Sequence, residues 1–201
     1  MALRYAILGY LSSAPGSGYD LATQLGQGLG WFWSASHSQI YPALKRLEED
    51  GLVSSESTTV GEKLEKRIYA ITDEGLEALT EWAAAPPMYR PNRDPERLQL
   101  IFSDLGDTET IKLHLEAHRD LYRDRAAQLR NTRDQIVERK NRRVEERMAN
   151  KPEARKQLTL LLRDIAYAGD IGRAEHEVEW AEEALERLAT YASEFTPVTT
   201  S

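Results

Sequence analysis

The sequence predicts a mostly α-helical protein with one small β-hairpin. Apolar residues recur at intervals of three and four over most of the 201 residues, which is typical of amphipathic helices. Residues 52–72 break this pattern, because two runs rich in Val, Thr, Ile and Tyr flank Gly61, as in a hairpin. Four prolines between positions 86 and 95 then divide the chain into two parts. We therefore expect an N-terminal domain that contains the hairpin and a C-terminal domain of long helices.

The N-terminal part reads as three helices, a hairpin and a short fourth helix. The third helix has the clearest limits, because Ser36 and Gln39 form a capping box that starts it at His37, and Gly51 ends it. Three helices followed by a hairpin is the order of a winged helix-turn-helix, with the third helix as the recognition helix and the hairpin as the wing. The predicted fold class is mostly α with a small β wing: an N-terminal winged helix-turn-helix plus a C-terminal long-helix dimerisation domain.

The C-terminal part contains two long helical stretches. One is expected from Thr108 to about Met148, and the other follows the turn at Pro152. Their apolar stripes are too long for a small N-terminal domain to cover alone, so we expect a homodimer. The residues expected at the dimer contact share one face of the last helix, and they are Tyr167, Ile171, Val178, Leu185 and Leu188.

The cluster of prolines marks the domain boundary, since a proline-rich segment forms a stiff linker. We expect a winged helix-turn-helix DNA-binding domain at 1–85, a linker at 86–95, a helical dimerisation and effector domain at 96–195 and a flexible tail at 196–201.

Composition excludes several classes of protein. The chain has no cysteine, which excludes a disulfide framework and a thiolate metal site and favours a reducing compartment, so we expect a cytoplasmic protein. Neither a secretory signal peptide nor the roughly 18 apolar residues of a membrane span is expected. The net charge of −7 is unusual for a nucleic-acid binder, so any DNA contact must depend on where a few cations are placed.

The third helix carries the candidate DNA contacts. A helical wheel places Ile40, Leu44 and Leu47 on one face, which leaves a polar face opposite. A proline inside a helix costs up to about 3 kcal/mol, so Pro42 on the outward face indicates a functional surface rather than a merely solvated one, which is the alternative. The candidates for base or phosphate contact are Ser38, Gln39, Tyr41, Pro42, Lys45 and Arg46.

The hairpin adds three cations near its tip, Lys63, Lys66 and Arg67. They are placed to hold a phosphate or to enter the minor groove of double-stranded DNA. The alternative is that they are strand-edge charges which prevent aggregation.

Three motifs resemble the PadR family of transcriptional regulators. The segment SQIYPALKRLEEDGLV at 38–53 is similar to the family's recognition-helix signature, and GYDL at 18–21 and RIYAITDEG at 67–75 follow the family's order and spacing. The resemblance is specific over 1–80, whereas 176–188 looks like the long helical domain of the larger, phenolic-acid-responsive subfamily. It implies a dimer that binds a palindromic operator, usually as a repressor, and often senses a small aromatic or drug-like molecule.

The resemblance places a tentative effector pocket at the domain junction, and plain core packing is the alternative for its residues, Trp31, Trp33, Trp82, Tyr167 and Trp180. No metal or cofactor is expected. His114 and His118 have the spacing of a zincin motif, but Leu115 stands where that motif needs Glu. No nucleophile or phosphate-binding motif indicates an enzyme. The alternative function is a winged-helix module that binds protein rather than DNA.

Overall fold

The computed structural model describes residues 2–27, 37–60, 64–88 and 94–195. The chain divides into two compact units, each built from two stretches of sequence. The first unit comprises Met1–Met88 and Arg139–Lys156, and the second comprises Tyr89–Glu138 and Gln157–Ser201. The first unit therefore contains the expected N-terminal domain and, in addition, a short segment that lies between the two long helices in sequence.

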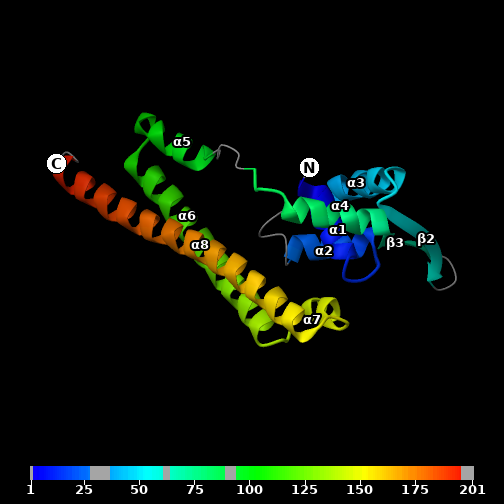
Figure 1. Cartoon of the computed structure of the whole chain (residues 1–201). Helices are drawn as coiled ribbons and strands as arrows, with labels where there is room; N and C mark the ends of the chain where they lie inside the picture. Colours follow the sequence, from blue (N-terminus) through cyan, green and yellow to red (C-terminus); the bar gives the residue numbers. More distant parts are fainter. Residues whose placement is uncertain (1, 28–36, 61–63, 89–93, 196–201) are drawn as a thin grey trace. The chain divides into compact units, whose positions relative to one another are not determined.

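The first unit is a winged helix-turn-helix, which confirms the predicted fold class (Figure 1). Its three antiparallel strands pair in the order β1-β3-β2, so the hairpin β2–β3 forms the wing and the short β1 extends it. The elements are α1 (Ala2–Leu11), β1 (Gly16–Ser17), α2 (Gly18–Gln27), α3 (His37–Glu49), β2 (Val53–Val60), β3 (Leu64–Ile71), α4 (Asp73–Ala84) and α7 (Arg142–Met148).

The limits of α3 agree with the sequence signals that the structure describes. The helix begins at His37, and Gly51 follows its end with a positive φ of 72°. The Gly51 N–H donates to the carbonyl of Glu48 and the Leu52 N–H to that of Leu47, which is a Schellman motif. Ser36, the first residue of the expected capping box, lies outside the described residues. The terminal turn directs the chain from α3 straight into β2.

The core of the first unit is formed by the apolar faces of α1, α2 and α3. The fully buried side chains include Leu8, Leu21, Ile40 and Leu44, and Tyr69 of β3 closes one side of the cluster. Gly75 of α4 lies so close to the entrance of β2 that a Cβ built on it would be 2.1 Å from the carbonyl oxygen of Leu52. Only a glycine therefore lets α4 approach the sheet at this point.

The second unit is a pair of long antiparallel helices with a short helical arm (Figure 1). It contains α5 (Pro95–Ile101), the 3₁₀ turn η2 (Ser103–Leu105), α6 (Thr108–Val137) and most of α8 (Glu153–Phe195). No helix in the described part of the chain is long and apolar enough to cross a membrane.

The buried faces of α6 and α8 pack together. The fully covered side chains are Leu115, Ala126, Leu129 and Ile136 on α6 and Tyr167, Asp170, Ile171, Ala174 and Ala181 on α8. Ion pairs flank this seam, among them Arg123–Glu182 at 2.8 Å and Arg133–Asp164 at 2.6 Å. Their numbers rise on one helix as they fall on the other, as an antiparallel pair requires.

The expectation of one helix from Thr108 to about Met148 is wrong. The helix ends at Val137, Arg139 adopts a φ of 59°, and Asn141 begins a new helix by accepting a hydrogen bond from the Val144 N–H at 3.2 Å. A left-handed residue cannot continue an α-helix, so α6 and α7 are separate elements. The break allows α7 to belong to the first unit.

We expect Gly75→Ala to destabilise the first unit, because the new methyl group would meet backbone rather than a movable side chain. Overpacking of this kind lowers the free energy of unfolding by about 1–3 kcal/mol, which urea denaturation would measure. Gly9→Ala in α1 is the control, since nothing described lies within 4 Å of the added Cβ; it should leave stability unchanged or raise it. Equal losses in both variants would contradict the close approach.

Candidate nucleic-acid interface

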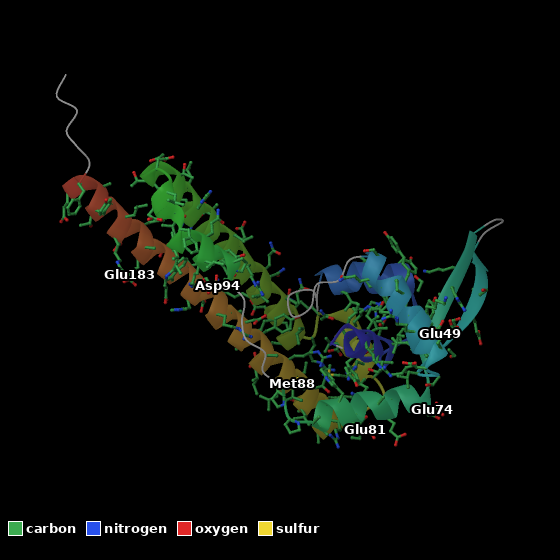
Figure 2. All side chains as sticks on the ribbon, turned by 90° about the horizontal axis from the view of Figure 1, so that it is seen from above. Glu49, Glu74, Glu81, Met88, Asp94 and Glu183 are labelled. Atoms are coloured by element: carbon green, nitrogen blue, oxygen red, sulfur yellow. The ribbon has the colours of Figure 1, made fainter. Side chains whose placement is uncertain are left out.

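Helix α3 presents one apolar and one polar face, as the sequence predicts. Ile40, Leu44 and Leu47 are buried in the core, and Glu49 marks the C-terminal end of the helix in Figure 2. The residues of the opposite face are all exposed, and they are Ser38, Gln39, Tyr41, Pro42, Lys45 and Arg46. The structure therefore brings these six candidates together on one surface.

Pro42 lies inside α3 as the sixth residue of the helix. It removes the N–H that would donate to the carbonyl of Ser38, four residues earlier, so the first turns are less tightly bonded than those of an ordinary helix. The side chain itself is exposed and adds nothing to the core. This weakness lies where a helix in the major groove makes its base contacts.

Tyr41 is held by the neighbouring helix α2. A Cβ built on Gly18 would be 2.6 Å from a ring carbon of Tyr41, so the ring packs directly on the backbone at the start of α2. Half of the side chain remains exposed. Gly18 thus positions a candidate contact, a role that its place in the GYDL motif did not reveal.

The two cations of α3 differ in their partners. The Lys45 ammonium lies 3.8 Å from Glu49, one turn later on the exposed face, which is a weak surface pair. Arg46 forms no ion pair with any residue that the structure describes, and its side chain is exposed. Both cations are therefore available to a phosphate at little cost.

The wing cations are already paired within the unit. Arg67 donates from Nη2 to both carboxylate oxygens of Glu48, at 2.9 and 3.1 Å, and from Nε to the Ser55 hydroxyl at 2.7 Å. This bridge connects β3 to the C-terminal end of α3. Lys66 lies 3.2 Å from Asp20 of α2. Lys63, the third wing candidate, lies outside the described residues.

Asp20 has a second task at the start of α2. Its carboxylate accepts hydrogen bonds from the hydroxyl and the N–H of Ser17, while its own N–H donates to the Ser17 hydroxyl, so the two residues form a reciprocal cap. The Ser17 hydroxyl, with a smaller contribution from Lys66, holds the pKa of Asp20 below its ordinary value against the effect of burial. The wing and α2 therefore share one charged anchor.

Helix α7 packs on the C-terminal end of α1. Arg147 donates to the carbonyl of Gly9 at 3.0 Å and to the hydroxyl of Ser12 at 2.6 Å, and burial lowers the pKa of its guanidinium. Arg143 stacks on the Tyr10 ring, 3.8 Å from its centroid, and donates to its hydroxyl. The last carbonyls of a helix lack intrahelical donors and attract a positive charge, so Arg147 supplies what α1 needs there.

A charged cluster joins the three helices of the second unit. Arg97 of α5 donates to Asp94 at 2.7 Å and to Glu177 of α8 at 2.8 Å, and its guanidinium lies 4.2 Å from the Trp180 ring centroid. His118 of α6 lies 3.1 Å from Glu177 through Nε2 and meets Trp180 edge-on. Burial alone would raise the pKa of Glu177, but the hydrogen bonds from Arg97 and His118 outweigh it, so this pKa is lowered.

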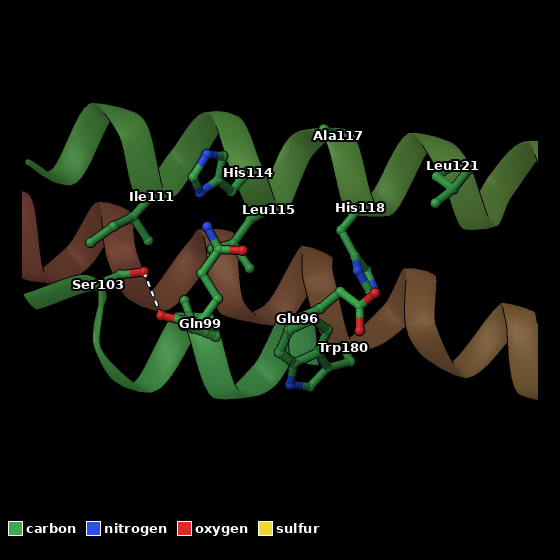
Figure 3. A pocket seen from close by; sticks show the side chains of 11 residues that line it. Glu96, Gln99, Ser103, Ile111, His114, Leu115, Ala117, His118, Leu121 and Trp180 are labelled. Carbon is green, nitrogen blue, oxygen red and sulfur yellow. Dashed lines mark hydrogen bonds between the residues drawn. The ribbon is translucent and has the colours of Figure 1, made fainter. Parts of the chain in front are cut away.

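A cavity of about 290 Å³ lies beside this cluster, between α5, α6 and α8 (Figure 3). The apolar part of its lining comes from Leu100, Ile111, Leu115, Leu121 and Trp180, and the polar part from Glu96, Gln99, Ser103, His114 and His118. Among the described residues, no group of three or more His, Asp or Glu side chains could hold a metal ion.

The tentative effector residues are not gathered at one place within either unit. Trp82 stacks on Tyr5 in the first unit with ring centroids 4.8 Å apart, and Tyr167 is buried in the seam of α8. Trp180 lines the cavity between α5, α6 and α8. Trp31 and Trp33 lie outside the described residues.

The residues expected at the dimer contact are partly covered within one chain. Tyr167 and Ile171 are buried against the chain's own α6, and Val178, Leu185 and Leu188 are half-buried. The sequence alone leaves this apolar stripe of α8 free for a second copy, because it does not show which face of α8 packs against α6. Helix α8 exposes a second group of apolar residues earlier in the helix, Leu158, Leu161, Leu162 and Ile165, and two aromatic residues at its C-terminal end, Tyr191 and Phe195.

A three-helix unit with a β wing and a polar outward face on its third helix defines the winged-helix class. Residues 7–81 match the family described as transcriptional regulator PadR-like, and residues 92–189 match the one described as virulence activator alpha C-term. A probable transcriptional regulator of Mycobacterium tuberculosis is 31% identical over 194 residues, which are 94% of this chain and 98% of that protein. The chain belongs to the PadR-like family, whose members are transcriptional regulators.

Three further comparisons concern one protein of Bacillus subtilis. Its negative transcriptional regulator PadR is 49% identical over 80 residues, which are 40% of this chain and 44% of that protein. The crystal structure of PadR in complex with operator DNA has 28% identity and a TM-score of 0.70, over 94% of this chain and 99% of that one. Its structure in complex with p-coumaric acid has 25% identity and a TM-score of 0.64 over the same shares.

Replacement of Glu177 by Gln tests the charged cluster. Because the pKa of Glu177 is lowered in the folded protein, its charge stabilises the fold above the unfolded-state pKa of about 4.3 and loses this effect as the pH falls through the lower, folded-state pKa. At pH 7 we expect Glu177→Gln to melt about 3–10 °C below the wild type, and the difference to shrink as the pH falls below about 4.3.

Calorimetry between pH 7 and pH 3 would measure this difference, with Arg97, His118 and Asp94 unchanged in both proteins. Glu183→Gln is the control, because Glu183 is an exposed carboxylate of α8 that pairs with no described residue (Figure 2). A deficit of Glu177→Gln that stays constant with pH would contradict the role of the charge.

Proposed function

We propose that this regulator is a homodimer that binds a palindromic DNA operator through α3 and the wing, and that it represses transcription until a small aromatic molecule releases it. The observation that carries the proposal is the division of α3. Its apolar face is committed to the core, and its opposite face exposes hydroxyl, amide and cationic groups suited to base edges and phosphates.

The solved complexes of PadR support both halves of this proposal. That protein has been crystallised with operator DNA and, separately, with p-coumaric acid. We propose the same organisation for this chain: a DNA-binding domain at 1–85, a linker at 86–95, a helical dimerisation and effector domain at 96–195 and a tail at 196–201. Helix α7 is the part of the helical domain that joins the DNA-binding unit.

The dimer follows from what one chain leaves uncovered. Leu158, Leu161, Leu162 and Ile165 lie on one face of α8 at intervals of three and four residues, and all are exposed. On α5, Leu98 and Ile101 are also exposed. A second copy is the occupant that fits, since a single winged helix reads only one half-site and two-fold symmetry supplies the other.

Release by a ligand requires only a modest preference. A molecule that favours a DNA-incompetent arrangement of the dimer by about 1.4 kcal/mol weakens operator binding tenfold. Because a dimer makes two sets of contacts at fixed spacing, a change in that spacing affects both half-sites.

The DNA contact is tested on the DNA upstream of the protein's own gene. Lys45→Ala and Arg46→Ala should each weaken binding and lower the slope of log K against log salt by about 1, because each removes one phosphate contact. Fluorescence anisotropy at several salt concentrations would measure the slope. Lys112→Ala is the control, an exposed lysine of α6 that also pairs with a glutamate one turn away. Unchanged slopes would favour the protein-binding alternative.

The dimer contact is tested with a charge in the exposed stripe. Leu161→Glu should convert the dimer to a monomer at micromolar concentration, because an unpaired carboxylate would be buried between the copies. Operator binding should weaken with it. Arg187→Glu places the same charge at an exposed position of α8 outside the stripe and should stay dimeric. Light scattering decides, and a dimeric Leu161→Glu would show that this stripe is not the interface.

A further inference from the structure

We propose that the cavity between α5, α6 and α8 is the effector site, and that it takes a small aromatic molecule carrying an ammonium or similar cationic donor rather than a carboxylate (Figure 3). The proposal rests on the proposed function, because it names the site and the chemical class of the molecule that releases the operator.

The size and lining of the cavity fit a small ring compound. Its volume of about 290 Å³ lies at the lower limit of ligand pockets, which occupy roughly 300–1,000 Å³. Leu115, Ile111 and Trp180 provide an apolar wall for a ring, while Gln99 and Ser103 provide hydrogen-bonding groups at the α5 side. An apolar lining with a few convergent polar groups is the usual character of a binding site.

The charge of the lining selects the ligand class. Glu96 is the one carboxylate that lines the cavity, and no lysine or arginine lines it. In the described part of the chain, Glu96 forms no ion pair. The other ionisable groups of the lining are His114 and His118, and His118 is already held by Glu177 at 3.1 Å. A ligand carboxylate would therefore face Glu96 with no lysine or arginine to offset it, whereas an ammonium would pair with this side chain.

Arg97, the residue after Glu96, is not free to reverse this preference for a cationic ligand. Arg97 directs its guanidinium to Asp94 and Glu177, at 2.7 and 2.8 Å, and lies over the Trp180 ring. Withdrawing it to meet an anionic ligand would leave Glu177, whose side chain is largely buried, without its main partner. The interactions that hold Arg97 also hold Trp180, so this wall of the cavity is in place before a ligand arrives.

The location of the cavity explains how a bound ligand would change the affinity for the operator. The cavity lies under α5, and α5 exposes Leu98 and Ile101, which we assigned to the contact with a second copy. A ligand that contacts both Glu96 on α5 and the wall on α6 favours one placement of α5, and so changes the surface that the second copy meets. The ligand thus acts on the spacing of the half-sites through the dimer contact.

Two probes that share a phenol ring and differ in charge test the site. Tyramine carries an ammonium, and 3-(4-hydroxyphenyl)propionate carries a carboxylate. On the full chain we expect calorimetry to show tyramine binding at least tenfold tighter than the propionate. Glu96→Gln should lower tyramine affinity about tenfold, which is about 1.4 kcal/mol, and remove the discrimination. Glu183→Gln, an exposed carboxylate outside the cavity lining, should change neither affinity.

A second variant tests the location itself. Ala117 lines the cavity from an exposed position of α6, so Ala117→Trp should fill the space without disturbing the core and abolish tyramine binding. No tyramine binding by the wild type at about 5 mM would overturn the proposal, as would full binding by Ala117→Trp or equal affinity in Glu96→Gln. Binding that weakens as protein concentration rises would also overturn it, because a second copy would then fill the cavity.

The effect of the ligand on operator binding is measured separately, as the operator dissociation constant with and without tyramine. Tyramine should raise the operator dissociation constant of the wild type and leave that of Glu96→Gln nearly unchanged. Binding of tyramine with no effect on operator affinity overturns the assignment as an effector site. A protein that binds no operator at all refutes the proposed function instead, and calorimetry on the same protein still decides the ligand class of the cavity.

Discussion

The burial of one face of α3 is the constraint on which the DNA-binding surface depends. Ile40, Leu44 and Leu47 are covered by the core formed with α1 and α2, so the rotation of the helix about its axis is determined by apolar packing. Every outward residue then has a fixed direction. The Schellman turn at Gly51 leads the chain directly into β2, so the same packing also sets where the wing begins.

The charges around this surface form a network that a phosphate bound at the proposed site would rearrange. Arg67 bridges the wing to Glu48 of α3, and Lys66 bridges it to Asp20 of α2. Both cations are partly exposed, so these pairs contribute little stability, and a phosphate competes with a carboxylate for the same guanidinium or ammonium. The first unit carries equal numbers of acidic and basic side chains, so its long-range field attracts nonspecific polyanions only weakly. We therefore expect discrimination to rest on the proposed contacts of α3.

Local sequence signals were sufficient to predict the winged helix-turn-helix and the outward face of α3, because those features depend on residues close together in sequence. Local signals could not predict which distant side chains contact each other. Arg97 and Glu177 are 80 residues apart, and Arg67 and Glu48 are 19 apart, so their pairing appears only once the fold is known. The break after Val137 depends on the left-handed Arg139, a residue type that carries no turn signal. The seam residues Tyr167 and Ile171 looked uncovered because one stripe serves an intrachain or an interchain contact equally well.

The contact of Arg147 with the end of α1 has a consequence for the order of synthesis. The first unit is not contiguous, since it needs a segment that follows Met88 by roughly 60 residues, and at ~5–20 residues per second the ribosome takes about 3–12 s to supply it. During that interval the Ser12 hydroxyl can still donate to the carbonyl of Gly9, at 2.9 Å, and water takes the place of the guanidinium. A nascent chain therefore completes its first unit only after α5 and α6 have been translated, which couples maturation of the winged helix to synthesis of the first half of the helical unit.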